Sequence, residues 1–434
     1  MELYNIFLQH PIICTDSRNC QSGSIFFALK GEKFDANAYA LSALENGCAY
    51  AVIDEVKYAI DDRFILVENV LETLQQLATS HRKKLKIPVI GITGTNGKTT
   101  TKELITSVLK EKYNVHYTQG NLNNHIGVPL TLLQLKEHHQ IAVIEMGANH
   151  SGEIKLLAEI ACPDYGLITN VGKAHLEGFG SFDGVKQTKS ELYEYISQNG
   201  GMIFINSDNA DLMEMSTRVG FDTDNENVRA YSLQPGNKDC FVNGEISNCS
   251  PFLEMSCQIL DERIEIKTNL IGTYNAENVM VAVAIGKYFG LRDFDIKNGL
   301  EKYIPQNNRS QLTITDKNKL IVDAYNANPT SMRAAILNFS QTASEQKTLI
   351  LGDMLELGEY SNHEHQSIVD LLQQNKFKNV LLVGKNFIRT KNSYLNFADV
   401  TELTNYLISH PITDNYILIK GSRGVKLENI LPIL

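Results

Sequence analysis

The stretch from Ile87 to Tyr113 decides the fold of this chain and reads IPVIGITGTNGKTTTKELITSVLKEKY. An apolar run breaks into a glycine-rich turn that ends in Gly97, Lys98 and Thr99, and apolar residues then recur at helical spacing. Strand and helix patterns on both sides disfavour the alternative, a surface turn that contains Gly-Lys-Thr by chance. The order therefore predicts a strand, a phosphate-binding loop and a helix.

The turn carries the groups that a nucleoside triphosphate needs. Backbone N–H groups of a tight turn and the positive end of the next helix form an anion site. Lys98 would add a charge near the outer phosphates, and the Thr99 hydroxyl stands where phosphate loops usually hold Mg²⁺. Ile92 replaces the glycine expected five residues before Gly97, so the loop is a variant. The predicted phosphate-binding residues are Gly94, Thr95, Asn96, Gly97, Lys98, Thr99 and Thr100.

Size and composition describe an ordinary globular protein of two or three domains. The chain has 434 residues, of which 43% are hydrophobic and 21% charged, and this length exceeds the size at which one core keeps growing. No apolar run is long enough to span a bilayer. The first residues, MELYNIFLQHP, lack a basic segment followed by an apolar core. We therefore expect no secretory signal, no membrane insertion and a cytoplasmic location.

Charge and cysteine usage argue against two further classes of protein. A formal charge of −10 disfavours a nucleic-acid binder, since affinity for the phosphate backbone comes from concentrated lysine and arginine. An odd number of cysteines without a C-x-x-C spacing argues against a disulfide framework and against a zinc site. The seven cysteines, which we expect to be reduced thiols, are Cys14, Cys20, Cys48, Cys162, Cys240, Cys249 and Cys257.

The order of elements predicts an α/β fold with three domains, residues 1–86, 87–304 and 305–434. The first is a small α/β unit, and the charged stretch HRKKLK at its end is either a linker or a solvated helix end. The second alternates strands and helices as in a mostly parallel phosphate-loop ATPase sheet, with an antiparallel addition at residues 227–271 and a closing helix at Ala276–Phe289. The third alternates four strands with helices, which indicates a doubly wound unit.

Polar residues at strand ends of the second segment are the candidate catalytic groups. Glu145 ends the run IAVIE, where its carboxylate can face the phosphate loop and share a Mg²⁺; a solvated strand-end glutamate is the alternative. Asn170 and His175 follow the next strand, and for His175 a metal or phosphate role competes evenly with a structural one. Lys189 lies in a predicted helix, where an exposed charge is the ordinary interpretation.

The third segment offers a second group of polar residues. Carboxyl ends of strands are where open sheets of this kind bind ligands, and Asp323, Asp353 and Lys420 lie at such ends. The run DAYNANP forms either a tight loop or a polar ligand site. The candidates are Arg309, Asp323, Tyr325, Asn326, Asn328 and Lys420.

Taken together, the motifs resemble the Mur ligase family, and the resemblance extends through all three segments. The motifs are DSRNCQSGSIFFALKGEKFDAN from Asp16, GTNGKTT from Gly94, GNLNNHIGVPLTLL from Gly120, EMGANHSGEI from Glu145, TNVGKAHLEGFGS from Thr169, DAYNANPTSM from Asp323, LGDMLELG from Leu351 and KGSRG from Lys420. The resemblance implies an N-terminal domain that holds a UDP moiety, a central ATPase domain, and a C-terminal Rossmann-like domain that closes over the site.

The resemblance also implies roles for particular residues. Lys189 matches a lysine that the family carbamylates to help place the metal, although Thr188 replaces the usual alanine. GTYNAEN matches a nucleotide-contact motif in which Tyr274 replaces a histidine. The implied residues are Lys98, Glu145, His175 and Lys189 for catalysis; Thr99, Glu145 and His175 for the metal; Asn275, Asn278, Arg309 and Asp323 for ATP; and Ser17, Arg18, Asn123, Asn124, Tyr325, Asn326 and Asn328 for the substrates.

The implied activity is ATP-dependent amide formation in peptidoglycan synthesis, with Mg²⁺ as cofactor. The substrates would be UDP-N-acetylmuramoyl-tripeptide and D-alanyl-D-alanine, joined through an acyl phosphate, and a monomer is expected. Two alternatives stay open: another amide ligase of the family, acting on a folate or a different muramoyl peptide, and a nucleotide-dependent switch without product chemistry. The absence of an N-K-x-D guanine motif weakens the GTPase form of the second alternative.

Overall fold

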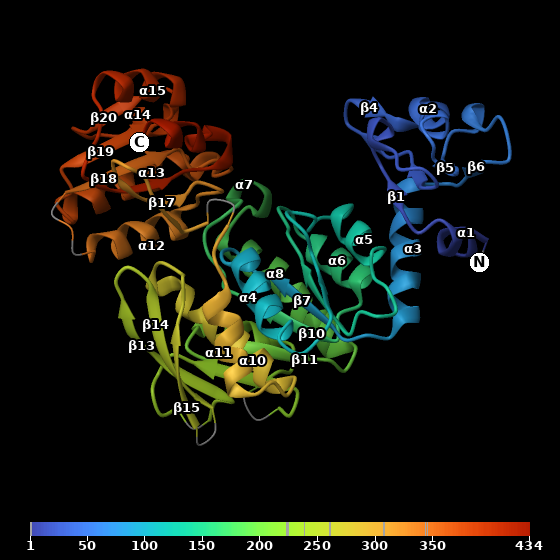
Figure 1. The fold of residues 1–434 in the computed structure, drawn as a ribbon, viewed down its shortest axis with the longest axis horizontal. Coiled ribbons are helices and arrows are strands. Elements are labelled where there is room, and N and C mark those ends of the chain that lie inside the picture. Colours follow the sequence, from blue (N-terminus) through green and yellow to red (C-terminus); the bar gives the residue numbers. More distant parts are fainter. Residues whose placement is uncertain are drawn as a thin grey trace.

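The computed structural model describes residues 2–222, 225–237, 239–259, 262–306, 309–342, 344 and 346–434. Among these residues the strands form three large sheets and one two-stranded hairpin. Figure 1 shows the blue N-terminal unit and the orange-to-red C-terminal unit on opposite sides of the view, with the central unit below them. The α/β fold predicted from the sequence is confirmed.

The N-terminal unit is built on a parallel sheet with the strand order β1-β2-β5-β6. Its elements are α1 Glu2–Gln9, β1 Ile13–Cys14, β2 Ile25–Phe27, β3 Lys30–Gly31, β4 Phe34–Asp35, α2 Ala40–Glu45, β5 Tyr50–Ile53 and β6 Phe64–Leu66. Phe26, Ile53 and Leu44 belong to one buried cluster between the sheet and α2. Burial of such apolar side chains is the main force that holds the unit together.

Helix α3, Val70–Leu85, joins this unit to the central one. It packs on α5, Gly127–Leu132, and on α6, Glu153–Ala161. Arg82 in its last turns is buried and pairs with the Asp164 carboxylate at 2.7 Å. The stretch HRKKLK is therefore the end of the helix that joins the two units, and it is solvated only in part.

The central unit contains a sheet of nine strands among the described residues, in the order β15-β14-β13-β12-β11-β10-β7-β9-β8. The strands are β7 Val89–Thr93, β8 Val115–Tyr117, β9 Ile141–Glu145, β10 Tyr165–Ile168, β11 Met202–Asn206, β12 Val228–Ser232, β13 Val242–Cys249, β14 Leu253–Ile259 and β15 Glu262–Lys267. From β8 to β13 all neighbours are parallel, whereas β13, β14 and β15 pair antiparallel. The predicted antiparallel addition is confirmed, and it continues the parallel sheet.

The helices of the central unit are α4 Lys98–Leu109, α5, α6, α7 Leu176–Phe179, α8 Phe182–Gln198, α9 Ala210–Arg218, α10 Ala276–Tyr288 and α11 Asp293–Lys302. Helix α10 is apolar on all sides because it lies buried between the sheet and its neighbour α4. The helix predicted for Ala276–Phe289 is confirmed to within one residue, but α11 was not predicted. Across the described ranges, no helix has the length and apolar content that crossing a bilayer requires.

The C-terminal unit has a sheet of six strands in its described part, in the order β16-β17-β21-β18-β19-β20. Its elements are β16 Gln311–Ile314, β17 Lys319–Asp323, α12 Pro329–Ser340, β18 Lys347–Gly352, α13 Ser361–Gln374, β19 Asn379–Val383, α14 Lys385–Ile388, β20 Leu395–Phe397, α15 Val400–Ser409 and β21 Tyr416–Lys420. Helices α12 and α13 pack on one face and α15 on the other. The four predicted strands are present, with β16 and β20 added at the edges.

The topology places the candidate residues at the carboxyl ends of neighbouring strands in two sheets. In the central sheet β7 lies between β10 and β9, so the loops that follow these three parallel strands meet. In the C-terminal sheet Asp323 and Lys420 are register partners on the parallel strands β17 and β21.

Candidate active site

A cavity of about 930 Å³ lies between the central and C-terminal units. Nearly all of the residues predicted for ATP, metal and substrate line it. These are Thr95, Asn96, Gly97, Lys98, Thr99, Thr100, Asn123, Asn124, Glu145, His175, Asn275, Asn278, Arg309, Asp323, Tyr325, Asn326 and Asn328. The structure therefore brings together residues from six separate motifs of the sequence, and Arg309 with them.

The phosphate loop connects β7 to α4 and is held in place from the loop after β10. The N–H groups of Thr95 and Asn96 donate to the Asn170 carbonyl and to its side-chain oxygen, both at 2.9 Å. Gly94 has a φ of 142°, and a Cβ there would lie 2.0 Å from Thr169 Oγ1. The glycine at this position is thus required both by the backbone conformation and by the close approach of the neighbouring loop.

Lys98 folds back over the loop that precedes it. Its Nζ donates to the backbone carbonyls of Gly94 at 2.7 Å and Thr95 at 3.2 Å. Burial lowers the pKa of Lys98, while the Glu145 carboxylate opposes that shift. The ammonium group lies where it can leave these carbonyls for the phosphates of a nucleotide.

Glu145 ends β9 with its carboxylate beside the loop, and it is buried. One oxygen, Oε1, accepts from Asn123 Nδ2 at 2.8 Å and lies 3.3 Å from Thr99 Oγ1. The other, Oε2, has no hydrogen-bond partner among the described residues, and Lys102 Nζ lies 3.9 Å from it. A buried carboxylate oxygen without a hydrogen bond is costly, and its location beside a threonine hydroxyl suits a divalent cation.

His175 precedes the short helix α7 and has a left-handed backbone with a φ of 49°. Its Nδ1 makes an ion-pair contact with the carboxylate of Glu356, and this contact lowers the pKa of Glu356. Glu356 belongs to the LGDMLELG motif of the C-terminal unit, and it was not predicted as a site residue. The histidine therefore lines the cavity and also links two units.

Lys189 lies on α8 and is 2% exposed, so the interpretation of an exposed helical charge is wrong. Burial lowers its pKa to about 7, and the nearby positive charge of Lys98 acts in the same direction. Lys189 does not line the cavity itself. Its side chain approaches the ring of Phe179, with Nζ 5.5 Å from the ring centroid. A neutral amine is thus accessible near physiological pH.

The GTYNAEN motif holds the other side of the loop. Asn278 accepts from Thr101 Oγ1 and donates to Asn275 Oδ1, both at 2.9 Å. Asn275 in turn donates to the Ile271 carbonyl at 2.8 Å. A Cβ on Gly97 would lie 2.8 Å from Asn278 Oδ1, so the buried Asn278 amide packs directly against the phosphate loop, and Asn275 supports it from behind.

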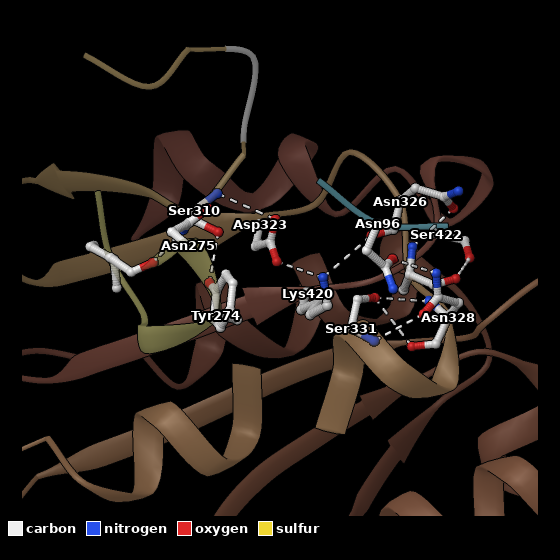
Figure 2. Close-up of polar contacts among 12 residues, drawn as sticks. Asn96, Tyr274, Asn275, Ser310, Asp323, Asn326, Asn328, Ser331, Lys420 and Ser422 are labelled. Atoms are coloured by element: carbon white, nitrogen blue, oxygen red, sulfur yellow. Dashed lines mark hydrogen bonds and ion pairs between the residues drawn. The ribbon is translucent and has the colours of Figure 1, made fainter. Parts of the chain in front are cut away.

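Tyr274, which stands where the family pattern more often has histidine, makes a contact with the C-terminal unit. Its hydroxyl lies 2.8 Å from Ser310 Oγ, and the Ser310 N–H donates to Asp323 Oδ1 at 3.3 Å. Burial raises the pKa of Tyr274, which keeps the phenol protonated. Figure 2 shows Tyr274, Ser310, Asp323 and Lys420 in one continuous line of polar contacts.

Asp323 and Lys420 form a buried ion pair at 2.5 Å on adjacent strand ends. Lys420 Nζ also lies 3.4 Å from the Asn326 carbonyl. Because Asp323 is already paired with an ammonium group and a backbone N–H, it serves first to orient its neighbours in this structure.

The DAYNANP loop carries an aromatic platform and a helix cap. The Arg309 guanidinium lies 3.7 Å from the Tyr325 ring centroid, and Arg423 lies 5.7 Å from the same ring. Asn328 caps α12 and donates from Nδ2 to Asn96 Oδ1 at 2.7 Å, across the two units (Figure 2). Arg423 was missed as a site residue; its only signal in the sequence was its place in the KGSRG motif.

Ser17 and Arg18 lie apart from the cavity, in a turn of the N-terminal unit. The Arg18 side chain is exposed and pairs with Asp16 at 2.8 Å, and this hydrogen bonding lowers the pKa of Asp16 to about 2. Lining residues of the cavity therefore come from two of the three units.

Two family models match the chain. The Mur ligase middle domain matches residues 92–286, and the Mur ligase, glutamate ligase domain matches residues 308–423. A relative from Bacillus subtilis, UDP-N-acetylmuramoyl-tripeptide--D-alanyl-D-alanine ligase, is 36% identical over 97% of this chain and 92% of its own length. The protein of the same name from Escherichia coli K12 is 34% identical over 100% of this chain and 95% of its own length.

Solved structures are similar over nearly the whole length. MurF from Acinetobacter baumannii has a TM-score of 0.85 at 32% identity and covers 97% of this chain and 92% of that one. MurF ligase from Thermotoga maritima, in complex with ADP, has a TM-score of 0.85 at 26% identity and covers 98% and 97%. A folylpolyglutamate synthase from Mycobacterium tuberculosis shares the fold alone, with a TM-score of 0.61 at 14% identity over 84% of this chain and 94% of that one.

Proposed function

The chain belongs to the Mur ligase family, and from this premise we propose that it is the ATP-dependent ligase that joins D-alanyl-D-alanine to UDP-N-acetylmuramoyl-tripeptide. The product is the pentapeptide precursor of peptidoglycan. The observation that carries the proposal within the structure is the buried Glu145 carboxylate beside Thr99 and Lys98, at the edge of a cavity between two units. Full-length similarity to ligases of this name favours this substrate pair over a folate.

The reaction forms two bonds in sequence. The terminal carboxylate of the tripeptide attacks the γ-phosphorus of ATP, which forms an acyl phosphate and releases ADP. The amine of D-alanyl-D-alanine then attacks the acyl carbon, loses a proton and expels inorganic phosphate. Both anions must approach each other in the first step, so the Lys98 charge and the loop N–H groups neutralise the phosphoryl oxygens.

A Mg²⁺ site fits the donors that the structure presents. Thr99, Glu145 and His175 would hold the ion. The buried Oε2 of Glu145, which has no hydrogen bond among the described residues and lies 3.9 Å from Lys102 Nζ, is the feature that favours a cation there. When bound, the metal supplies charge neutralisation for the transferring phosphoryl group. His175 would have to leave its contact with Glu356, or bind through its other ring nitrogen.

Carbamylation of Lys189 is part of the proposal. The ammonium group first loses a proton, and the neutral amine then attacks CO₂ and loses a second proton. A buried cation thereby becomes a carbamate anion, which would help to hold the metal. The Lys189 pKa of about 7, lowered by burial, makes the neutral amine available. Turnover of Lys189→Ala measured with and without short carboxylic acids tests this role. We expect partial rescue by the acids, and full activity of the variant without them would remove Lys189 from the mechanism.

The remaining residues are proposed as substrate contacts. We assign Asn275, Asn278, Arg309 and Asp323 to the nucleotide, and Asn123, Asn124, Tyr325, Asn326 and Asn328 to the peptide and the dipeptide. Ser17 and Arg18 are assigned to the UDP moiety, because the Arg18 guanidinium is exposed in the N-terminal unit. The cytoplasmic location, the monomeric state and the domain limits at 86/87 and 304/305 likewise remain predictions.

A phosphate-release assay over a panel of substrates tests the proposed function. We expect ATP-dependent release only when a UDP-muramoyl-tripeptide and D-alanyl-D-alanine are both present, with Mg²⁺. Release with a folate and glutamate would identify another ligase of the family. Release with ATP alone, unaffected by either substrate, would identify a nucleotide switch and refute the proposal.

A further inference from the structure

Three cysteines converge in the N-terminal unit, far from the cavity in sequence and in the fold. Cys14 ends β1, Cys20 follows the turn Ser17–Asn19, and Cys48 precedes β5. Their sulfur atoms all lie within 4.8 Å of one another, and those of Cys14 and Cys20 are 3.4 Å apart. No spacing rule for the sequence would have indicated this, because the sheet rather than a short motif brings the thiols together.

The three thiols of the cluster differ in their exposure. Cys14 and Cys48 are buried, whereas Cys20 is partly exposed. Around them the polar contacts are weak ones: Cys14 Sγ donates to the Asp16 carbonyl at 3.1 Å, and Cys48 Sγ lies 3.2 Å from Ser24 Oγ. Burial raises the pKa of Cys14 and of Cys20, so without a cation these thiols stay protonated.

We propose that Cys14, Cys20 and Cys48 bind one thiophilic closed-shell divalent cation, of the Zn²⁺ and Cd²⁺ class, as three thiolates. Zinc–sulfur bonds of about 2.3 Å in a tetrahedral site place the sulfur atoms about 3.8 Å apart. The Cys14–Cys20 separation is 3.4 Å and no pair of the three sulfur atoms is more than 4.8 Å apart, so small side-chain rotations would complete the site. A water molecule would be the fourth ligand, on the side of the partly exposed Cys20.

Binding of one divalent cation by the three thiols releases three protons. Each thiol loses its proton to solvent as its sulfur bonds to the metal, so the site changes from neutral to a net charge of −1. Soft thiolate ligands select this class of ion over Mg²⁺, which prefers oxygen. The site would therefore not compete with the metal proposed for catalysis.

The site would also act on the loop that carries Ser17 and Arg18. Cys14 and Cys20 lie at the two ends of this loop, and Asn46, close to Cys48, donates to the Ser17 carbonyl at 3.0 Å. A cation that ties both ends to Cys48 would fix the loop conformation. This consequence rests on the proposed function, in which the loop contacts the UDP moiety, whereas cation binding itself does not.

Cadmium titration of the full, metal-free chain tests the site. With a non-thiol reductant present, we expect a thiolate-to-cadmium absorption band that saturates at one equivalent, accompanied by proton release. Cys20→Ser, chosen because the residue is partly exposed, should lose the stoichiometric band while its circular dichroism matches wild type. Cys240→Ser is the matched control: its sulfur lies 3.1 Å from Ser207 Oγ, like the Cys48–Ser24 pair, but outside the cluster. It should keep the full band.

The metal site would be overturned by the absence of the band in the reduced wild-type chain, or by a band that persists undiminished in Cys20→Ser. A Cys14–Cys20 disulfide that forms in air despite equimolar Cd²⁺ would also contradict it. The effect of the cation on the loop that carries Ser17 and Arg18 is measured separately, through KM values. Cadmium loading should change KM for the UDP-linked substrate and leave KM for ATP unaltered. If the band appears and both KM values stay constant, the coupling is wrong and the cation site stands.

Discussion

Among single residues, the proposed chemistry depends on charges that are buried without full compensation. Glu145 Oε2 has no hydrogen-bond partner among the described residues, and Lys189 is an almost fully buried lysine on a helix. Such groups destabilise a fold unless a ligand or a modification completes them. Substitution of either residue should therefore lower turnover without lowering the free energy of unfolding.

Substitution Glu145→Gln separates the two effects. We expect turnover to fall by roughly 10²- to 10³-fold, since a charge that stabilises the transferring phosphoryl group is lost. The unfolding midpoint should change little, because the variant no longer buries a carboxylate oxygen without a hydrogen bond but also loses the charge that lies 3.9 Å from the buried Lys102 Nζ. Activity assays at several Mg²⁺ concentrations and chemical denaturation check both. Wild-type turnover in the variant would remove Glu145 from the metal site.

Because the pKa of Lys189 is low, the free energy of unfolding should depend on pH. Folding lowers this pKa from 10.5 to about 7, so between these values the unfolded chain binds more protons. Wild-type stability should therefore rise as pH increases across that window, and fall as pH decreases. In CO₂-depleted buffer, Lys189→Met should be more stable than wild type by a few kcal/mol near pH 7, in line with a fully buried lysine. The denaturation midpoints of wild type and Lys189→Met should become equal as the pH rises towards about 10. A difference between the two midpoints that does not change with pH would contradict the prediction.

Several single residues could be assigned from the sequence and others could not. Lys98, Thr99 and Glu145 follow from strand-loop-helix order, because phosphate loops and strand ends have fixed spatial relations. Glu356 and Arg423 could not, since their contacts with His175 and Tyr325 depend on how two units are placed. The convergence of three thiols likewise depends on tertiary structure.

At the scale of helices and strands, the caps and loops link local structure to the site. Asn328 caps α12 with a capping box and also donates to Asn96 of the phosphate loop. One side chain thus stabilises a helix end and connects two units.

Two substitutions at Asn328 distinguish these roles. Asn328→Ala should lower the free energy of unfolding by about 1 kcal/mol, because the helix loses its cap. Asn328→Asp keeps the capping oxygen and should remain close to wild type in stability, but it loses the Nδ2 donor to Asn96. We expect KM for ATP to rise in both variants. Equal stability of the alanine and aspartate variants would refute the capping role.

The long, strongly patterned elements could be predicted and the short or amphiphilic ones could not. Helix α10 and the central strands stand out because uninterrupted apolar runs mark buried elements. The edge strands β16 and β20 are short and partly exposed, so their patterns are weak. The partial burial of the basic end of α3 could not be predicted, because Arg82 is buried by a tertiary ion pair with Asp164, which charge alone does not indicate.

At the scale of the whole molecule, closure of the C-terminal unit over the central one completes the cavity. Contacts between the two units include Lys173 Nζ to Glu364 at 2.9 Å, the Asn96–Asn328 bond and the Tyr274–Ser310 bond. Holding two substrates in attack geometry can lower a barrier by roughly 7 to 11 kcal/mol, so the relative placement of the units should govern turnover.

Removal of one contact between units should weaken closure without harming either unit. Lys173→Ala loses the pair with Glu364, which is partly exposed and is worth about 1 kcal/mol or less. We expect turnover to fall by up to about fivefold and small-angle scattering to indicate a larger radius of gyration. Lys186→Ala, which breaks the pair with Asp211 inside the central unit, is the matched control and should change neither. Identical behaviour of the two variants would contradict the closure argument.

The central claim is that the Gly94 to Thr100 loop positions ATP so that a substrate carboxylate becomes phosphorylated. The most direct measurement follows a heavy oxygen isotope placed in the terminal carboxylate of the UDP-muramoyl-tripeptide. Wild-type enzyme should transfer one labelled oxygen to each inorganic phosphate released, because the acyl phosphate breaks at the acyl carbon. Lys98→Ala should release almost no labelled phosphate. Unlabelled phosphate from the wild-type reaction, or normal transfer by Lys98→Ala, would contradict the account.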